Sequence, residues 1–235
     1  MIKVGIMQPY FLPYIGYFQL ISFVDKFIVY DNVEYTKKGW INRNRYLING
    51  RPEFFTIPLR RDSDFLPVSN RFLADTWPKE KVKILNKLSA AYRRAPYFNA
   101  GMEFVDKVFG CDSYNLFDFI FNSIRETVSV LNIPTPLYVS SGLDADETLT
   151  GKERVIDLCR SVGATDYINP IGGVGLYDKD DFCSKGLVLH FLKAKEYEYS
   201  QFSNEFVPFL SIMDVLFFNG FEKTERLIKN EFSIV

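Results

Sequence analysis

Short apolar segments of β-strand length alternate with segments of helical periodicity over most of the 235-residue chain. A helix between two such strands carries the chain back across the sheet, so this alternation favours parallel strands with helices packed on their faces. We therefore predict an α/β fold with a mostly parallel sheet and helices on both faces. The expected strands are residues 3–7, 26–30, 136–141, 166–170 and 187–192, and the main intervening helices are residues 15–22, 151–162 and 211–220.

Two segments depart from this alternation. Residues 45–59 hold Asn49-Gly50 between two β-rich runs, which predicts a hairpin with a type I′ turn. In the middle of the chain, apolar residues recur at three-to-four spacing and predict three consecutive helices within residues 78–132. We expect residues 1–235 to form a single α/β domain that includes this β-hairpin and a central helical segment at about 78–132.

Polar clusters follow four of the predicted parallel strands. They are the loop QPYFLPYIGY after the first strand, Asp31 after the second, SSGLDADE after Val139 and NPIGGVGLYD after Ile168. Ligands of open parallel sheets bind beyond the carboxyl ends of the strands, so the four clusters together predict a shared pocket. Each cluster alone is also compatible with ordinary loop composition.

The first of these loops contains the most specific signals. Gln8 is an amide at the end of a buried strand and needs hydrogen-bond partners there. The helix that begins near Ile15-Gly16 has free N–H groups, which could receive an anion. The alternative is structural, with Gly16 allowing close packing and the two prolines stiffening the loop. In the later glycine-rich loop, Gly172 and Gly173 match neither a dinucleotide fingerprint nor a P-loop, and we expect a loop that closes over the pocket.

The segment KKGWINRNR supplies a second group of candidate ligand-binding side chains. Alternation along a strand predicts Asn42 and Asn44 on one face and Arg43 and Arg45 on the other. Arginine suits carboxylates and phosphates, whereas asparagine suits sugar hydroxyls or a base edge. A solvated strand face is the alternative, but it would not need the two asparagines or Trp40.

Candidates for general acid or base chemistry are few. The single histidine, His190, lies within an apolar strand and is expected to be a buried core residue. Acid and base roles would then fall to Asp, Glu, Lys or Tyr. Asp214 stands in an otherwise apolar helix and must be paired if it is buried, either within the fold or with a ligand.

Composition excludes several classes of protein. Twenty-eight basic and 29 acidic residues give a net charge of -1, which does not indicate a nucleic acid or an anionic membrane as partner. Three distant cysteines indicate neither a disulfide framework nor a zinc site, and no metal site is predicted. We expect a cytoplasmic protein without membrane insertion, and oligomerisation stays open. The 23 Phe and 14 Tyr indicate a large core and are typical of ligand pockets.

Four motifs together resemble the WbqC-like family of bacterial surface-polysaccharide gene clusters. They are QPYFLPYIGYF, DKFIVYDNVEYTKKGWINRNR, NPIGGVGLYD and LSIMDVLFFNG, and they occur in matching order over nearly the whole chain. The resemblance implies a role in O-antigen or related glycan biosynthesis. It further implies addition of an acyl or aminoacyl group, such as glycyl, to an amino sugar.

The first turn also resembles that of nucleotidyltransferases and class I synthetases, which implies a sheet of that Rossmann-like type. Those proteins carry His-x-Gly-His where this chain has Tyr14-Ile15-Gly16-Tyr17. Tyrosine can donate a hydrogen bond to phosphate but does not bring the charge of an imidazolium. Lys37, Lys38, Arg43 and Arg45 could supply that charge.

Three functions follow as hypotheses: an ATP-dependent ligase or aminoacyltransferase that uses Mg²⁺, an ATP-independent transferase with an activated acyl donor, and a non-catalytic accessory protein that binds a nucleotide-linked sugar. The candidate catalytic residues are Asp31, Arg43 and Asp214. The candidate cofactor-binding residues are Gln8, Tyr10, Tyr14, Gly16, Tyr17, Gly172 and Gly173. The candidate substrate-binding residues are Trp40, Asn42, Asn44, Arg45 and Tyr177.

Overall fold

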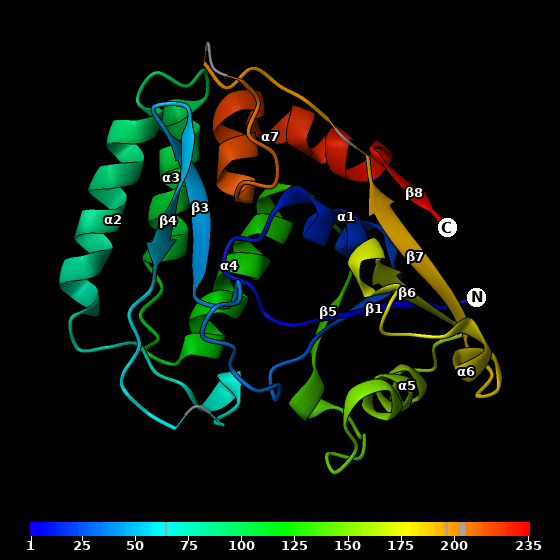
Figure 1. Cartoon of the computed structure of the whole chain (residues 1–235). Coiled ribbons are helices and arrows are strands. Elements are labelled where there is room, and N and C mark those ends of the chain that lie inside the picture. Colours follow the sequence, from blue (N-terminus) through cyan, green and yellow to red (C-terminus); the bar gives the residue numbers. More distant parts are fainter. Residues whose placement is uncertain (64, 196, 203–204) are drawn as a thin grey trace.

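A six-stranded sheet forms the centre of the molecule (Figure 1). The computed structural model describes residues 1–63, 65–195, 197–202 and 205–235. The strand order is β5-β2-β1-β6-β7-β8, and every neighbouring pair is parallel except the last, in which β8 runs antiparallel to β7. The strands are β1 (Lys3–Met7), β2 (Lys26–Val29), β5 (Leu137–Val139), β6 (Asp166–Pro170), β7 (Val188–Ala194) and β8 (Phe232–Ile234).

Helices cover both faces of this sheet, as the alternation of segments predicts. Helices α1 (Ile15–Phe23) and α7 (Ile212–Asn230) lie on one face, and α5 (Gly151–Ser161) and α6 (Lys179–Cys183) lie on the other (Figure 1). Side chains of β1 and β2 alternate between two cores: Val4, Ile6 and Ile28 pack with α5, whereas Phe27 and Val29 pack with α1. The predicted α/β fold with a mostly parallel sheet is therefore confirmed.

The predicted hairpin and the central helices form a second group of elements beyond the carboxyl ends of the parallel strands (Figure 1). They comprise β3 (Arg43–Ile48), β4 (Arg51–Thr56), α2 (Trp77–Tyr92), α3 (Phe98–Phe109) and α4 (Leu116–Val130). Asn49 and Gly50 have φ of 50° and 73°, as the predicted hairpin turn requires. The short helical turns η1 (Val68–Asn70), η2 (Ser140–Gly142) and η3 (Ile171–Gly173) lie in loops.

The structure also contains elements that the periodicity did not predict. Strand β8 and helix α6 are short and give little pattern, and α7 continues ten residues beyond the predicted end at Gly220. His190 was expected to be buried, but its side chain is 34% exposed, and its Nε2 lies 3.0 Å from the Asp166 carboxylate. The prediction of a core histidine is therefore wrong in its burial: alternation along β7 turns Leu189 and Phe191 into the core with α5 and α6, and His190 lies on the other face of the sheet, where it is partly exposed.

Helix α7 bends at Gly220, whose φ of 71° and ψ of 178° are accessible almost only to glycine. A Cβ at this position would also lie 2.7 Å from the Tyr97 ring. We expect Gly220→Ala to lower the free energy of unfolding by about 2–3 kcal/mol, or the melting temperature by roughly 5–10 °C.

Gly163→Ala is the matched control for this substitution. Gly163 also has a positive φ, of 72°, but nothing lies within 4 Å of the position that a Cβ would occupy there. The substitution should cost only about 1 kcal/mol, as alanine does at an ordinary left-handed position. Equal melting temperatures for the two variants would contradict the special constraint at Gly220.

Candidate functional site

The strand order marks one position along the sheet as the natural site for a ligand. Counting only the strands of this sheet, the order becomes 3-2-1-4-5-6, and the connections leave β1 and β6 in opposite directions. Such a switch point opens a crevice at the carboxyl ends of the two diverging strands. In this sheet the loop after β1 and the loop that begins at η3 after β6 lie at that position. The sequence-predicted residues Gln8, Tyr10, Gly172 and Gly173 lie in these two loops.

Two tyrosines organise the start of the loop after β1. The buried Tyr17 hydroxyl donates to the backbone carbonyl of Gln8 at 3.1 Å, and the Tyr10 hydroxyl lies 3.5 Å from Gln8 Oε1. The two rings are 5.9 Å apart. Burial raises the pKa of both hydroxyls above 10, so both are neutral donors near pH 7. Gln8 and Tyr10 remain partly exposed and can face a ligand, whereas Tyr17 supports them from below.

Tyr14 covers the first turn of α1. A Cβ on Gly16 would lie 2.4 Å from a carbon of the Tyr14 ring and 2.7 Å from its hydroxyl oxygen, so only glycine leaves room for the ring. Burial raises the pKa of the Tyr14 hydroxyl. The helix N-terminus that could receive an anion therefore has a neutral phenol lying against it.

Asn44 holds the same loop from the other side. Its side-chain amide donates to the carbonyls of Phe11 at 3.0 Å and Leu12 at 2.6 Å, and its Oδ1 accepts from the Arg45 N–H. Leu12 has a positive φ of 45°. Asn42 is equally occupied, because it accepts from the Tyr35 hydroxyl and donates to the carbonyl of Ile57. Both asparagines are buried, and their amides connect segments of the fold.

Trp40, Arg43 and Arg45 lie on the opposite, outer face of the hairpin together with Phe54. The Trp40 and Phe54 rings stack 5.9 Å apart, Arg43 lies over Phe54, and Arg45 lies over Trp40. Both aromatic rings are well exposed. Backbone carbonyls hold the two guanidinium groups: Arg43 donates to Lys38 and Gly39, and Arg45 donates to Pro208 and Phe209.

This outer face continues to the start of α1. Phe209, whose carbonyl receives Arg45, packs edge-on against Tyr14 with ring centroids 6.1 Å apart. Phe209 therefore contacts both the predicted substrate-binding residue Arg45, which lies over Trp40, and the predicted cofactor-binding residue Tyr14.

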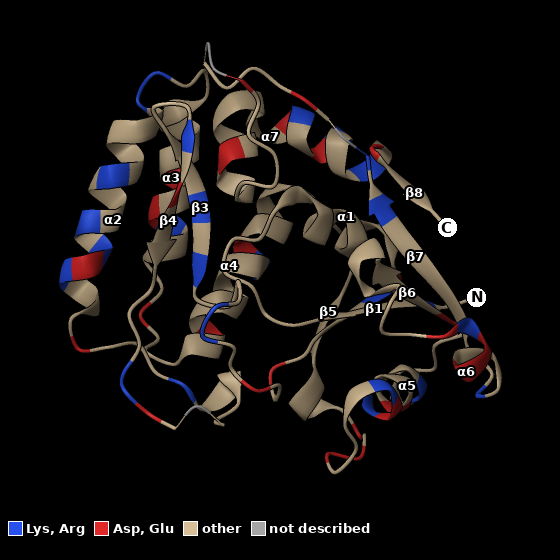
Figure 2. Ribbon diagram, in the orientation of Figure 1, with Lys and Arg blue, Asp and Glu red and all other residues tan. Residues whose placement is uncertain are grey.

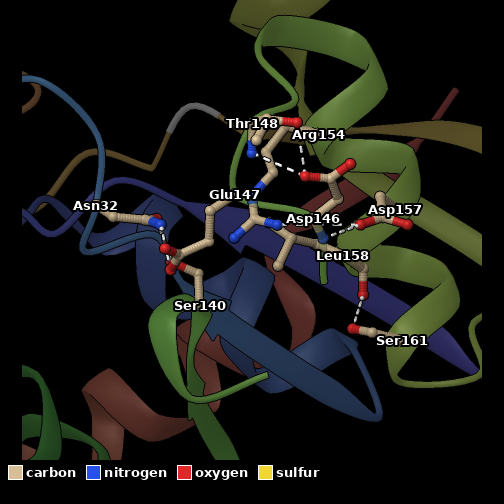
Figure 3. A network of polar contacts seen from close by, with 9 residues as sticks. All are labelled: Asn32, Ser140, Asp146, Glu147, Thr148, Arg154, Asp157, Leu158 and Ser161. Carbon is tan, nitrogen blue, oxygen red and sulfur yellow. Dashed lines mark hydrogen bonds and ion pairs between the residues drawn. The ribbon is translucent and has the colours of Figure 1, made fainter. Parts of the chain in front are cut away.

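Asp31 connects the ends of β2 and β5. Its Oδ1 accepts from the Ser140 hydroxyl at 2.7 Å and from the Ser141 N–H at 2.9 Å. Asn32 continues the network, with its amide 3.4 Å from the Glu147 carboxylate (Figure 3). Asp31 is only 3% exposed. Its hydrogen bonds hold the start of the 140–147 loop, and it lies at the edge of the sheet where the parallel strands end.

Arg154 is a candidate residue that we did not identify from the sequence. It lies in the first turn of α5, is 1% exposed and points into the 140–148 loop (Figure 3). Among the described residues, Nη1 and Nη2 have no hydrogen-bond partner, and the ion pair with Asp157 is long, at 3.9 Å. Its position four residues before Leu158, on the apolar face of α5, is the signal that could have revealed it.

The loop after β6 has one part packed against the core and one part exposed. Asn169 Oδ1 would lie 2.0 Å from a Cβ on Gly173, so this glycine lets the Asn169 amide cross the turn and donate to the Tyr167 hydroxyl at 2.6 Å. Tyr177 packs against Tyr167 with ring centroids 5.9 Å apart and belongs to the core beneath the sheet. Gly172 is exposed, and nothing lies within 4 Å of a Cβ placed there.

Asp214 lies apart from the sheet edge, in the first turn of α7. It is fully buried and accepts from Tyr92 at 2.7 Å, Tyr199 at 2.6 Å and Gln201 at 2.8 Å. Tyr92 in turn accepts the N–H of Leu47 in β3. The carboxylate therefore ties the hairpin, α2 and α7 together, and a catalytic role would require one of its donors to move away.

Comparison with known proteins identifies the family of this chain. The WbqC-like protein family matches residues 8–226. The chain belongs to the WbqC-like protein family. It is also 29% identical over 229 residues to the uncharacterized protein Rv1507c of Mycobacterium tuberculosis, an alignment that covers 96% of this chain and 97% of that protein. No solved structure matches significantly.

Two further observations on this WbqC-like protein concern metal ions and membranes. Within the described ranges, no three His, Cys, Asp or Glu side chains are grouped so that they could hold a metal ion. None of the helices in the described part of the chain is both long enough and apolar enough to cross a membrane. The roles of the individual site residues remain predictions, and the structure shows which of these residues lie together.

The buried charge of Arg154 leads to a test of stability in this WbqC-like protein. Replacing a poorly paired buried arginine with an apolar side chain of similar length removes its desolvation cost. Asp157, its distant partner, is 32% exposed and can be solvated instead. We expect Arg154→Met to raise the free energy of unfolding by about 1–2 kcal/mol, measured by urea denaturation.

A marked loss of stability in Arg154→Met would show that the arginine holds the 140–148 loop in place. Arg160→Met is the matched control, because Arg160 lies on the exposed face of the same helix. It should change stability by less than about 0.5 kcal/mol.

Asp214 leads to a test of pH dependence. Burial raises the pKa of its carboxyl from 3.8 to about 6, against the opposing effect of its three donors. Between these values the folded protein retains a proton that the unfolded chain releases. The contribution of this group to the free energy of unfolding therefore falls as pH rises from about 4 to about 6. Two pKa units correspond to about 3 kcal/mol.

Asp214→Asn should lack this contribution. The difference in unfolding free energy between wild type and variant should therefore change by about 3 kcal/mol between pH 4 and pH 7. Tyr199→Phe, which removes one donor, should move the pH window upward. A difference that is constant with pH would contradict the assignment.

Proposed function

We propose that this protein is an enzyme of surface-polysaccharide biosynthesis that transfers an acyl or aminoacyl group, such as glycyl, to the amine of a nucleotide-linked amino sugar. Membership in the WbqC-like family suggests involvement in surface-polysaccharide biosynthesis. The observation that carries the proposal is the strand order, whose switch point between β1 and β6 is where sheets of this type bind nucleotides.

The side chains at this crevice suit a polar, uncharged part of a ligand. Gln8 and Tyr10 offer an amide and a neutral hydroxyl at the end of β1. Such groups form hydrogen bonds with a sugar or a base without requiring an opposite charge. The stacked aromatic and arginine side chains on the hairpin provide a second surface, connected to the crevice through Phe209 and Tyr14.

In the proposed reaction, the lone pair of the sugar amine forms a bond to the carbonyl carbon of the activated acyl group. The leaving group departs with the electron pair of its own bond, and the amine loses a proton to a base. Asp31 is the proposed base, because it lies at the ligand edge and its Oδ1 is held by Ser140 and Ser141. Hydroxyl donors such as Tyr10 would stabilise negative charge on the carbonyl oxygen.

In one form of the proposed reaction, ATP with Mg²⁺ is the co-substrate that activates the acyl group. The strand order and the glycine at the start of α1 fit a nucleotide. The ring of Tyr14 fits less well, because it lies against Gly16 in the first turn of α1, where a phosphate would approach. ATP would supply the leaving group for acyl activation, and Gln8, Tyr10 and Tyr14 are the residues that would contact it.

The same position of Tyr14 favours a second candidate function. An N-acyltransferase that takes an already activated donor, such as a thioester, needs no phosphate site at α1. The sugar nucleotide would then be bound as proposed, and only the source of the acyl group would differ.

Mass spectrometry of a panel of nucleotide-linked amino sugars tests the proposal. Each sugar is incubated with the full chain and either ATP, Mg²⁺ and a set of amino and carboxylic acids, or a set of acyl thioesters. We expect a mass increase corresponding to one amide bond in one of the two arms. The arm that gives the product separates the two candidate functions.

Tyr10→Phe should lower kcat/KM in that assay at least about tenfold, because it removes one hydroxyl donor at the crevice. Tyr114→Phe, on an exposed tyrosine of the helical segment, is the matched control and should leave the rate unchanged. If nucleotide-linked sugars raise the melting temperature but no donor yields a product, the protein is an accessory binding protein and the enzymatic proposal fails.

A further inference from the structure

A groove beneath the hairpin has an unusual concentration of positive charge. It has a volume of about 520 Å³ and is bordered by Tyr35, Asn42 and four cationic side chains, Lys37, Arg60, Arg61 and Arg71. Among the described residues, the Asp62 carboxylate also borders it. The whole chain has a net charge of only -1, so this excess of cations is local. Figure 2 shows the Lys and Arg segments gathered below the hairpin.

Arg71 is built into the wall of this groove. The residue is 4% exposed, its Nη1 donates to the carbonyl of Ser63 at 2.6 Å, and its guanidinium lies 4.6 Å from the centre of the Tyr35 ring. Its Nε is buried and has no hydrogen-bond partner among the described residues. A buried guanidinium with an unused donor is costly unless something else compensates it.

Hydrogen bonds connect Tyr35 and Asn42 at the floor of the groove to the backbone of the chain. The Tyr35 hydroxyl donates to Asn42 Oδ1 at 2.9 Å, and Asn42 donates to the carbonyl of Ile57 at 2.8 Å. Burial raises the pKa of Tyr35, while the positive charges of Arg71, Arg43 and Lys37 act in the opposite direction. The charges of Arg71 and of two cations from the segment KKGWINRNR therefore act on one hydroxyl.

Arg60 and Arg61 can reorient toward a ligand. Arg60 pairs with Asp75 at 2.8 Å, but this pair is 53% and 85% exposed and therefore contributes little. Arg61 is exposed at the rim. Guanidinium groups form paired hydrogen bonds with phosphate oxygens, which a groove with several arginines can use on two adjacent phosphates.

We propose that the groove bordered by Lys37, Arg60, Arg61 and Arg71 binds the diphosphate of a nucleoside diphosphate. This deepens the proposed function, since a nucleotide-linked sugar carries such a group, and it rests on that function only for the identity of the natural ligand. Binding of a diphosphate here does not require that the protein catalyse any transfer.

Isothermal titration of the full chain with inorganic pyrophosphate, inorganic phosphate and UDP tests the assignment. Pyrophosphate should bind at least about tenfold more tightly than phosphate, and its affinity should fall as salt is added. Tighter binding of UDP than of pyrophosphate would support the nucleoside diphosphate. Equal affinity of the two would contradict that part and leave a diphosphate from another source, such as a lipid carrier.

Arg61→Glu should weaken pyrophosphate binding at least about tenfold without unfolding the protein, since Arg61 is exposed. Lys87→Glu makes the same change of charge on the exposed face of α2 and is the matched control. Arg71→Met, which removes the buried donor, should also weaken binding, and its melting temperature is measured in parallel. Equal pyrophosphate affinity in Arg61→Glu and Lys87→Glu would overturn the assignment.

The transfer assay separates this inference from the proposed function. Absence of a transfer product together with pyrophosphate binding that depends on Arg61 contradicts only the enzymatic proposal. A transfer product together with pyrophosphate binding that is insensitive to Arg61 and Arg71 contradicts only the groove.

Discussion

The junction at Phe11, Leu12 and Pro13 is the contact on which the remaining structure depends. These residues lie in the loop between β1 and α1, so their backbone carbonyls have no partner within either element. Asn44 donates to the first two carbonyls, Ser211 donates to that of Leu12, and the N–H of Ile212 donates to that of Pro13. Buried carbonyls without partners would be costly, so three distant parts of the chain must meet here. The sheet, the hairpin and the start of α7 are thereby set relative to one another.

This junction explains why the candidate site has two surfaces. The sheet contributes the edge at the carboxyl ends of β1 and β6, with neutral donors such as Gln8 and Tyr10. The hairpin, held to the same loop, contributes stacked aromatic side chains on its outer face and a basic groove beneath it. A ligand with a neutral sugar part and a charged diphosphate part matches this separation of polar and cationic surface.

The buried ionic groups differ in how completely their hydrogen bonds are satisfied. Asp214 is fully supplied with donors and ties the hairpin to α7, whereas Arg154 and Arg71 retain buried nitrogens without partners among the described residues. A carboxylate with three hydrogen bonds is typical of a structural role. A buried arginine with unpaired N–H groups lowers the stability of the fold but can bind an anion. This combination is typical of a functional role.

The sequence alone determined the features that depend on local pattern. Apolar periodicity predicted the parallel strands and the helices between them, and Asn49-Gly50 predicted the hairpin turn, because these signals lie within a few residues of one another. The same alternation predicted that Asn42 and Asn44 share one face and Arg43 and Arg45 the other, and the structure buries both asparagines and leaves both arginines partly exposed. It did not predict β8, which is short and lies at the sheet edge, where it pairs with β7 and packs Phe232 against Phe23.

Only the tertiary structure decided what the polar side chains contact. Asn42 and Asn44 were expected to face a ligand, and their amides bind backbone carbonyls of the chain itself, Ile57 for the first and Phe11 and Leu12 for the second. Arg71 and Arg154 carry no local motif, and their unused donors arise from burial against residues distant in sequence or from a loop that folds over them. Hydrogen-bond partners and desolvation are properties of the assembled fold, since they depend on which segments meet, and periodicity along the chain does not contain that information.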